Sequence, residues 1–379
     1  MKIQQLEIVD SKVNVHWRDG TMTSYPSFWL RDHAKDPLSF DSKSQQRELF
    51  TAKVNPEIVP LGADISTDGE SVLIHWPGLP DPVHYSGKFL REFIQPRNQL
   101  DVWNKVIWDA NSITEDSYLI EWSQFLQDDG LARLMARITE NGFALMRGCP
   151  TNFDTVQQIA SQIGYVRHTI FGGLWEFEAN EGMADSAYTP KELRPHTDGT
   201  YSHDAPGLQL LMCCEYDAEG GESIMVDGLK IAETLAVNDP ESFELLKSIS
   251  VKGRYVGDGV ELIAQRPVFR TNHHGEILQV SFNNYDRAPF RLEDGVMEKF
   301  YHALGVYDKL ANSRNLQWRH ILAPGEMLIF DNWRVMHGRG VFTGKRKMAG
   351  CYLNHEDVES CARKLGLMSR SPKVSGFQV

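Results

Sequence analysis

Alternation of apolar and polar residues predicts short strands near the start of the chain. Residues 12–17 alternate with period two, so Val13, Val15 and Trp17 would share one buried face. An Asp-Gly pair after this run favours a hairpin turn. Residues 71–76 form a second strand candidate before a Pro-Gly turn. The pattern therefore indicates a small β-rich domain at the N-terminal end.

Further along, the pattern changes first to helical spacing and then to many short apolar runs. Trp103, Val106, Ile107 and Trp108 recur as on a helix, which predicts a helical connector. From about residue 140, short apolar runs alternate with Gly and Pro turn signals, which is typical of a sandwich or jelly roll. We therefore predict a mainly β fold with flanking helices (α+β). Its expected parts are an N-terminal β domain (1–95), a helical connector (96–139), a jelly-roll domain (140–370) and a tail (371–379).

Length, charge and cysteine usage exclude several classes of partner. With 379 residues the chain can bury a large core, which fits two domains. Its net charge of −12 argues against nucleic acid or an anionic membrane as a partner. The five Cys are scattered and include no Cys-x-x-Cys pair, as is typical in a reducing compartment. We find no apolar run of transmembrane length and no signal peptide, and we expect a cytoplasmic protein.

A His-x-Asp triplet provides the first candidate for a metal site. On an extended segment His196 and Asp198 would point to one face, and they match two of the three ligands in the 2-His-1-carboxylate triad of non-haem Fe(II) oxygenases. The triplet alone is weak evidence, because it occurs by chance in many chains. His337, after a strand-like apolar run, can supply the third ligand. Arg346 follows it, and a guanidinium can bind the carboxylate of a 2-oxo acid through two hydrogen bonds.

The chain resembles the γ-butyrobetaine and trimethyllysine dioxygenase family of Fe(II)/2-oxoglutarate oxygenases. The resemblance extends from about residue 10 to residue 360. The matching stretches are WLRDH at 29–33, DSKSQQR at 41–47, AYT at 187–189, HTD at 196–198, PGLQLL at 206–211, GGES at 220–223, NNYDRA at 283–288 and MHGR at 336–339.

This resemblance implies a fold, a set of cofactors and a reaction. The fold would be a double-stranded β-helix (jelly roll) joined to a small N-terminal β domain. Fe(II), 2-oxoglutarate and O2 would be required, and the expected metal ligands are His196, Asp198 and His337. Arg346 would bind 2-oxoglutarate, with Leu211 and Ser223 as further residues of that site. The implied reaction is hydroxylation of a substrate carbon.

The family binds a trimethylammonium group in an aromatic cage, which indicates where the substrate would lie. The matching aromatic residues are Phe171, Trp175, Tyr188 and Tyr352. A quaternary ammonium has no N–H to donate, so aromatic faces are its main source of attraction. Asp185 replaces an Asn of the γ-butyrobetaine enzymes and could attract the cation. Gly199 replaces a Tyr of those enzymes, and Tyr201 could occupy part of the vacated space.

The anionic end of the substrate needs hydrogen-bond donors and cations. Asn283, Asn284 and Arg287 lie in a matching stretch and are candidates. Arg194 is two residues before His196, so on a strand it would face the same side. A second cation there would suit a doubly charged phosphonate. Our first choice of substrate is therefore 2-(trimethylammonio)ethylphosphonate, with γ-butyrobetaine and trimethyllysine as alternatives.

The N-terminal domain departs from the family in one respect. Family members hold a structural zinc there, with a Cys cluster after the Leu-Arg-Asp motif and a later His. In this chain residues 33–40 contain no Cys, and His84 is the lone match. A structural zinc needs about four ligands. We therefore expect no structural zinc.

Two other functional classes stay open. A halogenase or desaturase could use the same cofactors, but halogenases usually lack the carboxylate ligand that Asp198 provides. A catalytically inactive binding module of the same fold is the second alternative, and the intact triad and Arg346 argue against it. We expect a small-molecule quaternary ammonium substrate and no nucleic-acid or membrane partner. A homodimer is an open alternative for the assembly.

Overall fold

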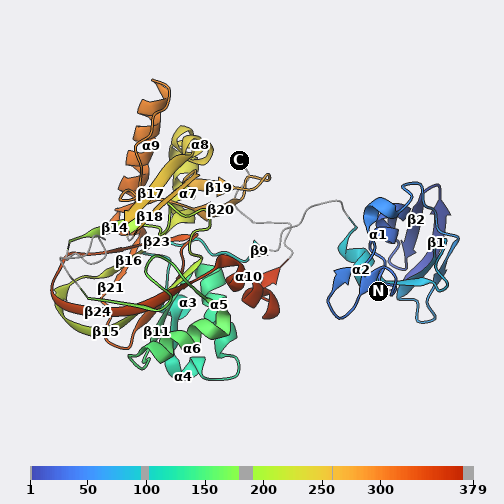
Figure 1. The fold of residues 1–379 in the computed structure, drawn as a ribbon, viewed down its shortest axis with the longest axis horizontal. Coiled ribbons are helices and arrows are strands. Elements are labelled where there is room, and N and C mark those ends of the chain that lie inside the picture. Colours follow the sequence, from blue (N-terminus) through green and yellow to red (C-terminus); the bar gives the residue numbers. More distant parts are fainter. Residues whose placement is uncertain (1, 95–101, 179–190, 258, 370–379) are drawn as a thin grey trace. The chain divides into compact units, whose positions relative to one another are not determined.

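The computed structural model describes residues 2–94, 102–178, 191–257 and 259–369. The chain folds into two compact units, Met1–Asn98 and Gln99–Val379 (Figure 1). The expected tail, Asp185 and Tyr188 lie outside the described residues.

The N-terminal unit contains two three-stranded antiparallel sheets and one two-stranded antiparallel pair. Strand order is β1-β2-β3 in one sheet and β6-β7-β8 in the other. The predicted strand faces are confirmed, because Val13, Val15 and Trp17 of β2 are buried together with Val72 and Ile74 of β7. The elements are β1 (Ile3–Val9), β2 (Lys12–Trp17), β3 (Met22–Pro26), α1 (Ser27–Asp32), β4 (Phe40–Asp41), β5 (Gln46–Arg47), η1 (Thr51–Lys53), β6 (Gly62–Ile65), β7 (Ser71–His75), β8 (Val83–Ser86) and α2 (Gly87–Glu92).

Polar side chains hold the segment that follows α1, where the family resemblance led us to look for a zinc site. Asp32, at the end of α1, accepts hydrogen bonds from Arg47 at 2.6 Å and from Thr51 at 2.5 Å. Arg31 is buried and donates to the hydroxyl of Ser39 at 2.8 Å. The hydrogen bonds of the Asp32 side chain therefore join α1 to β5 and η1. The expectation that this unit lacks zinc stays a prediction.

The C-terminal unit contains the longer strands and helices. Its elements are β9 (Val102–Trp103), α3 (Glu115–Tyr118), β10 (Leu119–Glu121), α4 (Trp122–Phe125), α5 (Gly130–Asn141), β11 (Phe143–Arg147), α6 (Phe153–Ile163), β12 (Val166–Arg167), β13 (Trp175–Glu178), β14 (Leu193–His196), β15 (Leu208–Gly220), β16 (Ser223–Asp227), α7 (Gly228–Asn238), α8 (Pro240–Ser248), β17 (Val251–Gly257), β18 (Val260–Arg266), β19 (Phe269–Thr271), β20 (Ile277–Val280), α9 (Val296–Ala311), η3 (Arg314–Leu316), β21 (Gln317–His320), β22 (Met327–Asp331), β23 (Val335–Arg339), β24 (Phe342–Leu353), α10 (His355–Lys364) and β25 (Met368–Ser369). Among the described residues, none of these helices combines the length and apolar character that a bilayer crossing requires.

Two sheets form the core of this unit. The larger has the order β10-β11-β22-β15-β24-β12, with β13 also paired to β24, and the smaller has the order β14-β23-β16-β21. Apart from β10 and β11, strands that are neighbours in these two sheets are far apart in the sequence, as in a double-stranded β-helix (Figure 1). The predicted fold class, a jelly-roll core with a small N-terminal β domain, is confirmed.

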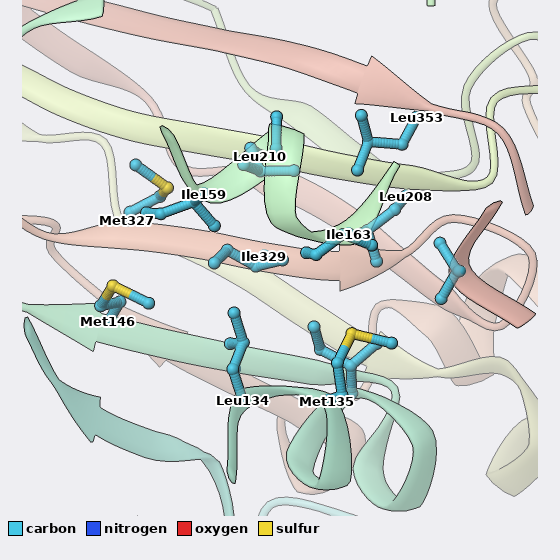
Figure 2. Close-up of a cluster of buried hydrophobic side chains, with 14 of the residues drawn as sticks. Leu134, Met135, Met146, Ile159, Ile163, Leu208, Leu210, Met327, Ile329 and Leu353 are labelled. Atoms are coloured by element: carbon cyan, nitrogen blue, oxygen red, sulfur yellow. The ribbon is translucent and has the colours of Figure 1, made fainter. Parts of the chain in front are cut away.

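Strand β22 shows how the side-chain pattern builds the layers. Met327 and Ile329 face α5 and α6 on the outer side of the larger sheet, where they pack with Leu134 (Figure 2). Leu328 and Phe330 belong to the cluster between the sheets. A strand covered on both faces is apolar without alternation, and each fully buried side chain of this size contributes roughly 1.5–3 kcal/mol. The smaller sheet is covered on its outer side by α7, α8 and α9.

The prediction of a helix around Trp103 to Trp108 is wrong. Residues Val102–Trp103 form strand β9, and the following residues are irregular. Their polar groups have partners distant in the sequence, because Val106 N–H donates to Glu140 and the indole of Trp108 donates to the Asn141 carbonyl at 2.6 Å. Tertiary contacts therefore override the local periodicity.

Candidate metal centre and active site

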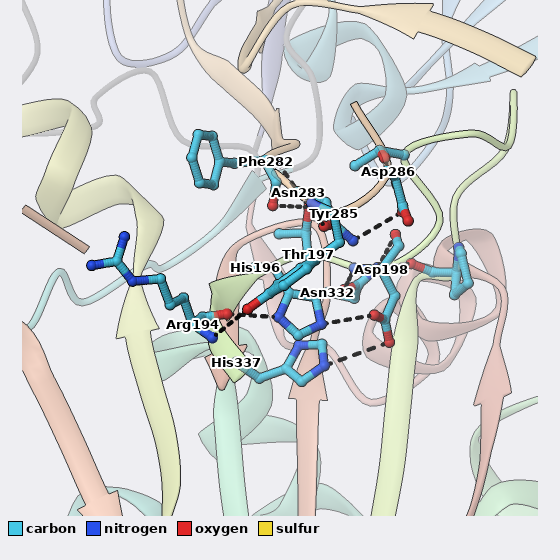
Figure 3. A network of polar contacts seen from close by, with 12 residues as sticks. Arg194, His196, Thr197, Asp198, Phe282, Asn283, Tyr285, Asp286, Asn332 and His337 are labelled. Atoms are coloured by element: carbon cyan, nitrogen blue, oxygen red, sulfur yellow. Dashed lines mark hydrogen bonds and ion pairs between the residues drawn. The ribbon is translucent and has the colours of Figure 1, made fainter. Parts of the chain in front are cut away.

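Three side chains predicted as metal ligands converge beside the β14–β23 strand pair of the smaller sheet (Figure 3). Nε2 of His196 lies 3.3 Å from Oδ1 of Asp198, and Nε2 of His337 lies 3.5 Å from Oδ2. The three ligand atoms lie within 4.8 Å of one another. His196 and His337 are direct partners across the β14–β23 pair, so the sheet register fixes the two imidazoles relative to each other.

Asp198 reaches the site from a turn and not from a strand. Strand β14 ends at His196, so Asp198 lies two residues beyond the strand, and its carboxylate still meets His196 as expected. Gly199 follows with φ +71°, and a Cβ there would meet Cδ of Pro206 at 2.6 Å. A turn that needs a left-handed residue and no side chain requires glycine.

Each histidine turns its Nε2 toward Asp198. Nδ1 of His196 lies 2.9 Å from the carbonyl oxygen of Arg194 and donates to it, so Nε2 is the nitrogen directed at Asp198. Nε2 of His337 faces the same carboxylate. Nδ1 of His337 is buried, with no hydrogen-bond partner in the described part of the chain.

The charge states suit a divalent metal. Burial alone would raise the pKa of Asp198, but His337, His196 and Tyr352 lower it to well below its ordinary value. Burial lowers the pKa of His337 to about 4. Asp198 is therefore ionised and His337 neutral near neutral pH, the state in which these groups bind metals. Burial acts to lower the pKa of His196, but the neighbouring Asp198 carboxylate raises it, so a metal would displace a proton from this imidazole. Two imidazoles and one carboxylate fit Fe(II).

A cavity of about 380 Å³ opens beside these three side chains. Eight of the other predicted site residues line it. They are Phe171, Trp175, Tyr201, Leu211, Ser223, Asn283, Arg346 and Tyr352. The structure thus brings residues from β13, β15, β16 and β24 and their connecting loops to one space.

Arg346 provides a cation at one end of this cavity. It is buried on β24, and its guanidinium lies 5.2 Å from the ring centre of Phe342. Its Nε is buried and lacks a hydrogen-bond partner among the residues the structure describes. Burial lowers the pKa of this guanidinium. An anion such as a carboxylate would satisfy both the charge and the open donor, so the site fits 2-oxoglutarate.

Arg194 does not face the cavity, contrary to the sequence-based prediction. Its guanidinium is directed away from the carboxylate of Asp198 (Figure 3) and forms an ion pair with Asp308 at 2.7 Å. The side chain is 54% exposed. A register shift explains the error, because three residue steps from Leu193 to His196 oppose two steps on β23. Such a bulge reverses the expected alternation of faces.

Two other candidates for the anionic end are also placed away from the cavity lining. Asn284 is exposed. Arg287 lies over the rings of Phe290 at 6.0 Å and Tyr301 at 5.9 Å. Of the predicted stretch, Asn283 lines the cavity, so the expectation that all three side chains meet at one site is wrong for this structure.

Three charged residues that the sequence analysis missed line the cavity, namely Arg167, Asp286 and Arg339. Asp286 accepts hydrogen bonds from Asn283 at 2.9 Å and from Thr200 at 3.2 Å. It belongs to the matching NNYDRA stretch, which could have indicated it. Arg167 pairs with Asp204 at 2.7 Å. No motif marks Arg167, because it reaches the site through the short pairing of β12 with β24.

Comparison with known proteins gives two family matches. The model described as taurine catabolism dioxygenase TauD, TfdA family, matches residues 111–352. The model described as gamma-butyrobetaine hydroxylase-like, N-terminal, matches residues 5–91. Together these matches span both units of the chain.

Individual proteins agree with the family matches. A mitochondrial trimethyllysine dioxygenase from Homo sapiens is 31% identical over 92% of this chain and 85% of its own length. A gamma-butyrobetaine dioxygenase from Pseudomonas sp. (strain AK-1) is 28% identical over 92% of each chain. A solved structure from Burkholderia xenovorans, described as a putative alpha-ketoglutarate-dependent taurine dioxygenase, is 13% identical with a TM-score of 0.50. It covers 67% of this chain and 93% of that chain, which indicates a shared fold.

Proposed function

The chain belongs to the TauD/TfdA family of dioxygenases, and we propose that it uses Fe(II), 2-oxoglutarate and O2 to hydroxylate a small trimethylammonium zwitterion. The family resemblance inferred from the sequence is confirmed by the two family matches. The protein is therefore an Fe(II)/2-oxoglutarate-dependent dioxygenase. The substrate and the roles of individual residues are our proposal.

The observation that carries the proposal is the content of one cavity. It contains the three candidate ligands, the buried cation Arg346 and a group of aromatic rings. The ligands and Arg346 supply what a metal and a 2-oxo acid need. The rings supply what a quaternary ammonium needs, because that group attracts π faces and donates no hydrogen bond.

Each part of the cavity has a distinct task in this proposal. His196, Asp198 and His337 would hold Fe(II), while Arg346 and Ser223 would bind the distal carboxylate of 2-oxoglutarate beside Leu211. Bound Fe(II) supplies the redox chemistry, in which 2-oxoglutarate and O2 give succinate and CO2 while one substrate C–H bond becomes C–OH. The cavity walls would keep water out and orient one C–H bond toward the metal.

The cationic end of the substrate would lie against the aromatic residues. The ring centres of Trp175 and Tyr352 are 5.6 Å apart with planes inclined by 50°, so the two faces form a corner. Phe171 lines the same cavity. Each ring contact with a trimethylammonium group is worth ~0.5–2 kcal/mol. Asp286 would add attraction between opposite charges from another part of the cavity wall.

The anionic end requires a different cation from the one the sequence suggested. Arg194 is engaged with Asp308 outside the cavity. Arg167 lines the cavity with a side chain that is 17% exposed. We propose that Arg167, together with the amide of Asn283, meets the anionic group of the substrate.

The identity of that anionic group is the finer part of the proposal. The first compound to test is 2-(trimethylammonio)ethylphosphonate, because Arg167 would be a second cation beside Arg346 in the cavity lining and so would suit a doubly charged head group. γ-Butyrobetaine and trimethyllysine are the alternatives, and the named relatives act on those two compounds according to their names. All three share the trimethylammonium group that the proposed cage recognises.

A succinate-release assay across matched compounds tests the proposal. Purified protein with Fe(II), 2-oxoglutarate and O2 is given the three zwitterions and the primary-amine analogue of each. We expect succinate with at least one quaternary compound and much less with its primary amine. The matched control is His337→Ala, which should release no substrate-dependent succinate because it lacks one of three ligands.

Three results would contradict parts of this proposal. Equal turnover of the primary amines would reject the aromatic cage. Turnover of γ-butyrobetaine above that of the phosphonate would reject our first choice of head group. Tight 2-oxoglutarate binding without succinate for any compound would favour the inactive binding module.

A further inference from the structure

The amide side chain of Asn332 holds both backbone groups of Asp198. Its Oδ1 accepts the Asp198 N–H at 2.8 Å, and its Nδ2 donates to the Asp198 carbonyl oxygen at 3.1 Å (Figure 3). A side chain that bonds to the N–H and the C=O of one residue acts like a neighbouring strand. It fixes the peptide groups on both sides of Asp198.

The same amide also ties the ends of the turn together. Nδ2 of Asn332 donates a second hydrogen bond, at 2.8 Å, to the carbonyl oxygen of Pro206. The backbone N–H of Asn332 donates to the carbonyl oxygen of Gly207, also at 2.8 Å. One acceptor and two donors of the amide are therefore engaged with backbone groups. The turn that begins at Asp198 and ends at Pro206 is closed on one buried side chain.

Asn332 is itself held rigidly. It is 1% exposed and directly follows strand β22 in the centre of the larger sheet. Asp198, in contrast, lies beyond the end of β14 and has no strand partner in the described residues. The preceding residue, Thr197, is bound to Phe282 through its N–H at 2.8 Å. Thr197 thus anchors the strand end, whereas Asn332 anchors the ligand residue.

We propose that Asn332 is a positioning residue that sets the affinity of the site for Fe(II) by fixing the backbone of Asp198. The inference rests on the proposed metal-binding role of His196, Asp198 and His337. The side chain of Asn332 acts on the carboxylate through the backbone that carries it, from the opposite sheet, and does not itself bind the metal.

The chemistry of the side chain explains why an amide is needed. Aspartate in its place could still accept the Asp198 N–H. It could not donate to the carbonyl oxygens of Asp198 and Pro206, because an ionised carboxylate only accepts. Alanine would remove these hydrogen bonds from one buried and two partly buried backbone groups, and unpaired buried groups are costly.

The test measures metal binding without turnover. Co(II) is titrated anaerobically into apo wild type, Asn332→Ala and Asn332→Asp, with calorimetry for Kd and visible absorption for the ligand field. Loss of a residue that orients a metal ligand typically weakens metal binding about 10- to 100-fold. We expect a loss of that size in both variants, with a changed Co(II) spectrum.

A matched control separates positioning from general loss of stability. Asn141 is also buried and also donates to a backbone carbonyl, that of Ser117 at 2.8 Å, but away from the site. Asn141→Ala should keep the wild-type Kd for Co(II) even if its Tm falls. An equal loss of Co(II) affinity in Asn141→Ala would overturn the proposal.

Other outcomes are equally decisive. Wild-type Kd in a folded Asn332 variant overturns this inference alone and leaves the proposed function standing. Failure of wild type to bind Co(II) at all overturns the metal site itself. If neither variant folds, hydrogen exchange in apo wild type decides, since the proposal requires a protected Asp198 amide and fast exchange of that amide rejects it.

Discussion

The hydroxyl of Tyr352 lies 2.9 Å from Oδ2 of Asp198 and donates a hydrogen bond to it. The ring of the same residue packs beside Trp175. One side chain therefore contacts both the proposed substrate cage and a proposed metal ligand. The sequence indicates only the first of these roles for Tyr352.

Tyr352→Phe should separate the two roles. Phenylalanine keeps the aromatic face but removes a hydrogen bond to a charged group, which is worth roughly 1.5–3 kcal/mol. We expect weaker metal binding and a lower kcat, with the KM for the quaternary substrate changed much less. Anaerobic metal titration and steady-state kinetics measure the two effects. A rise in KM alone would show that the hydroxyl serves the substrate and not Asp198.

Arg346→Ala should raise the KM for 2-oxoglutarate. A buried charge pair between the guanidinium and the distal carboxylate would be lost, and roughly 2–4 kcal/mol corresponds to a 30- to 1000-fold change. Arg346→Lys should be intermediate, because an ammonium cannot form two parallel hydrogen bonds. Measurement of 2-oxoglutarate KM at saturating primary substrate checks both variants. An unchanged value would remove Arg346 from that role.

Arg194→Ala should have little effect on catalysis. Its ion pair with Asp308 involves side chains that are 54% and 30% exposed, and such surface pairs contribute ~0–1 kcal/mol to stability. We expect less than about a twofold change in substrate KM and a Tm within a few degrees of wild type. A tenfold rise in KM would instead restore the substrate-binding role that the sequence suggests for this arginine.

Breaking the buried pair of Arg334 and Asp227 should strongly destabilise the fold. The two side chains are 3% and 0% exposed and form two hydrogen bonds, at 3.1 and 2.8 Å. Removing one partner of such a pair costs about 3–5 kcal/mol. Urea unfolding of Arg334→Ala, Asp227→Ala and the double variant measures the effect. The double variant should lose much less than the two single losses added together.

Alkaline pH should lower stability through buried thiols. Burial raises the pKa of Cys213 to about 11 and those of Cys149 and Cys351 to about 12, from an ordinary value near 9. Above pH 9 the unfolded chain loses these thiol protons while the folded chain keeps them, so the free energy of unfolding falls as pH rises toward 11–12. Urea titrations under reducing conditions at pH 8, 9 and 10 measure the slope. Cys351→Ala should make the slope shallower, and an unchanged slope would contradict this source.

Sequence patterns predict well where one local rule controls the structure. The strand containing Val13, Val15 and Trp17 can be found because apolar residues alternate with polar ones along the sequence, as buried and less buried positions alternate along the strand. His196, Asp198 and His337 can be found because ligand chemistry restricts residue type. The run of short strands favours a sandwich or a jelly roll, and the choice of the double-stranded β-helix comes from the family resemblance, since no local pattern encodes which distant strands pair.

The errors share a physical origin in contacts between distant segments. Arg194 is assigned to the wrong face because a bulge opposite β23 changes the count along β14. Trp103 and Trp108 have helical spacing, but the first stacks on His355 and the second bonds to Asn141. Arg167 cannot be identified from the sequence, because its position beside the cavity depends on the pairing of β12 with β24, a strand far along the chain.

The backbone at Gly199 limits how a chain of this kind can change by single steps. The family resemblance pairs this position with a Tyr of the γ-butyrobetaine enzymes. Any side chain here would require both a rare backbone conformation and displacement of Pro206, whose Cδ would be 2.6 Å from the new Cβ. Exchanging Gly199 for Tyr therefore disturbs the turn that carries Asp198 before it reshapes the cavity. Evolution or protein engineering must remodel residues 199–206 as one unit to interconvert the two patterns.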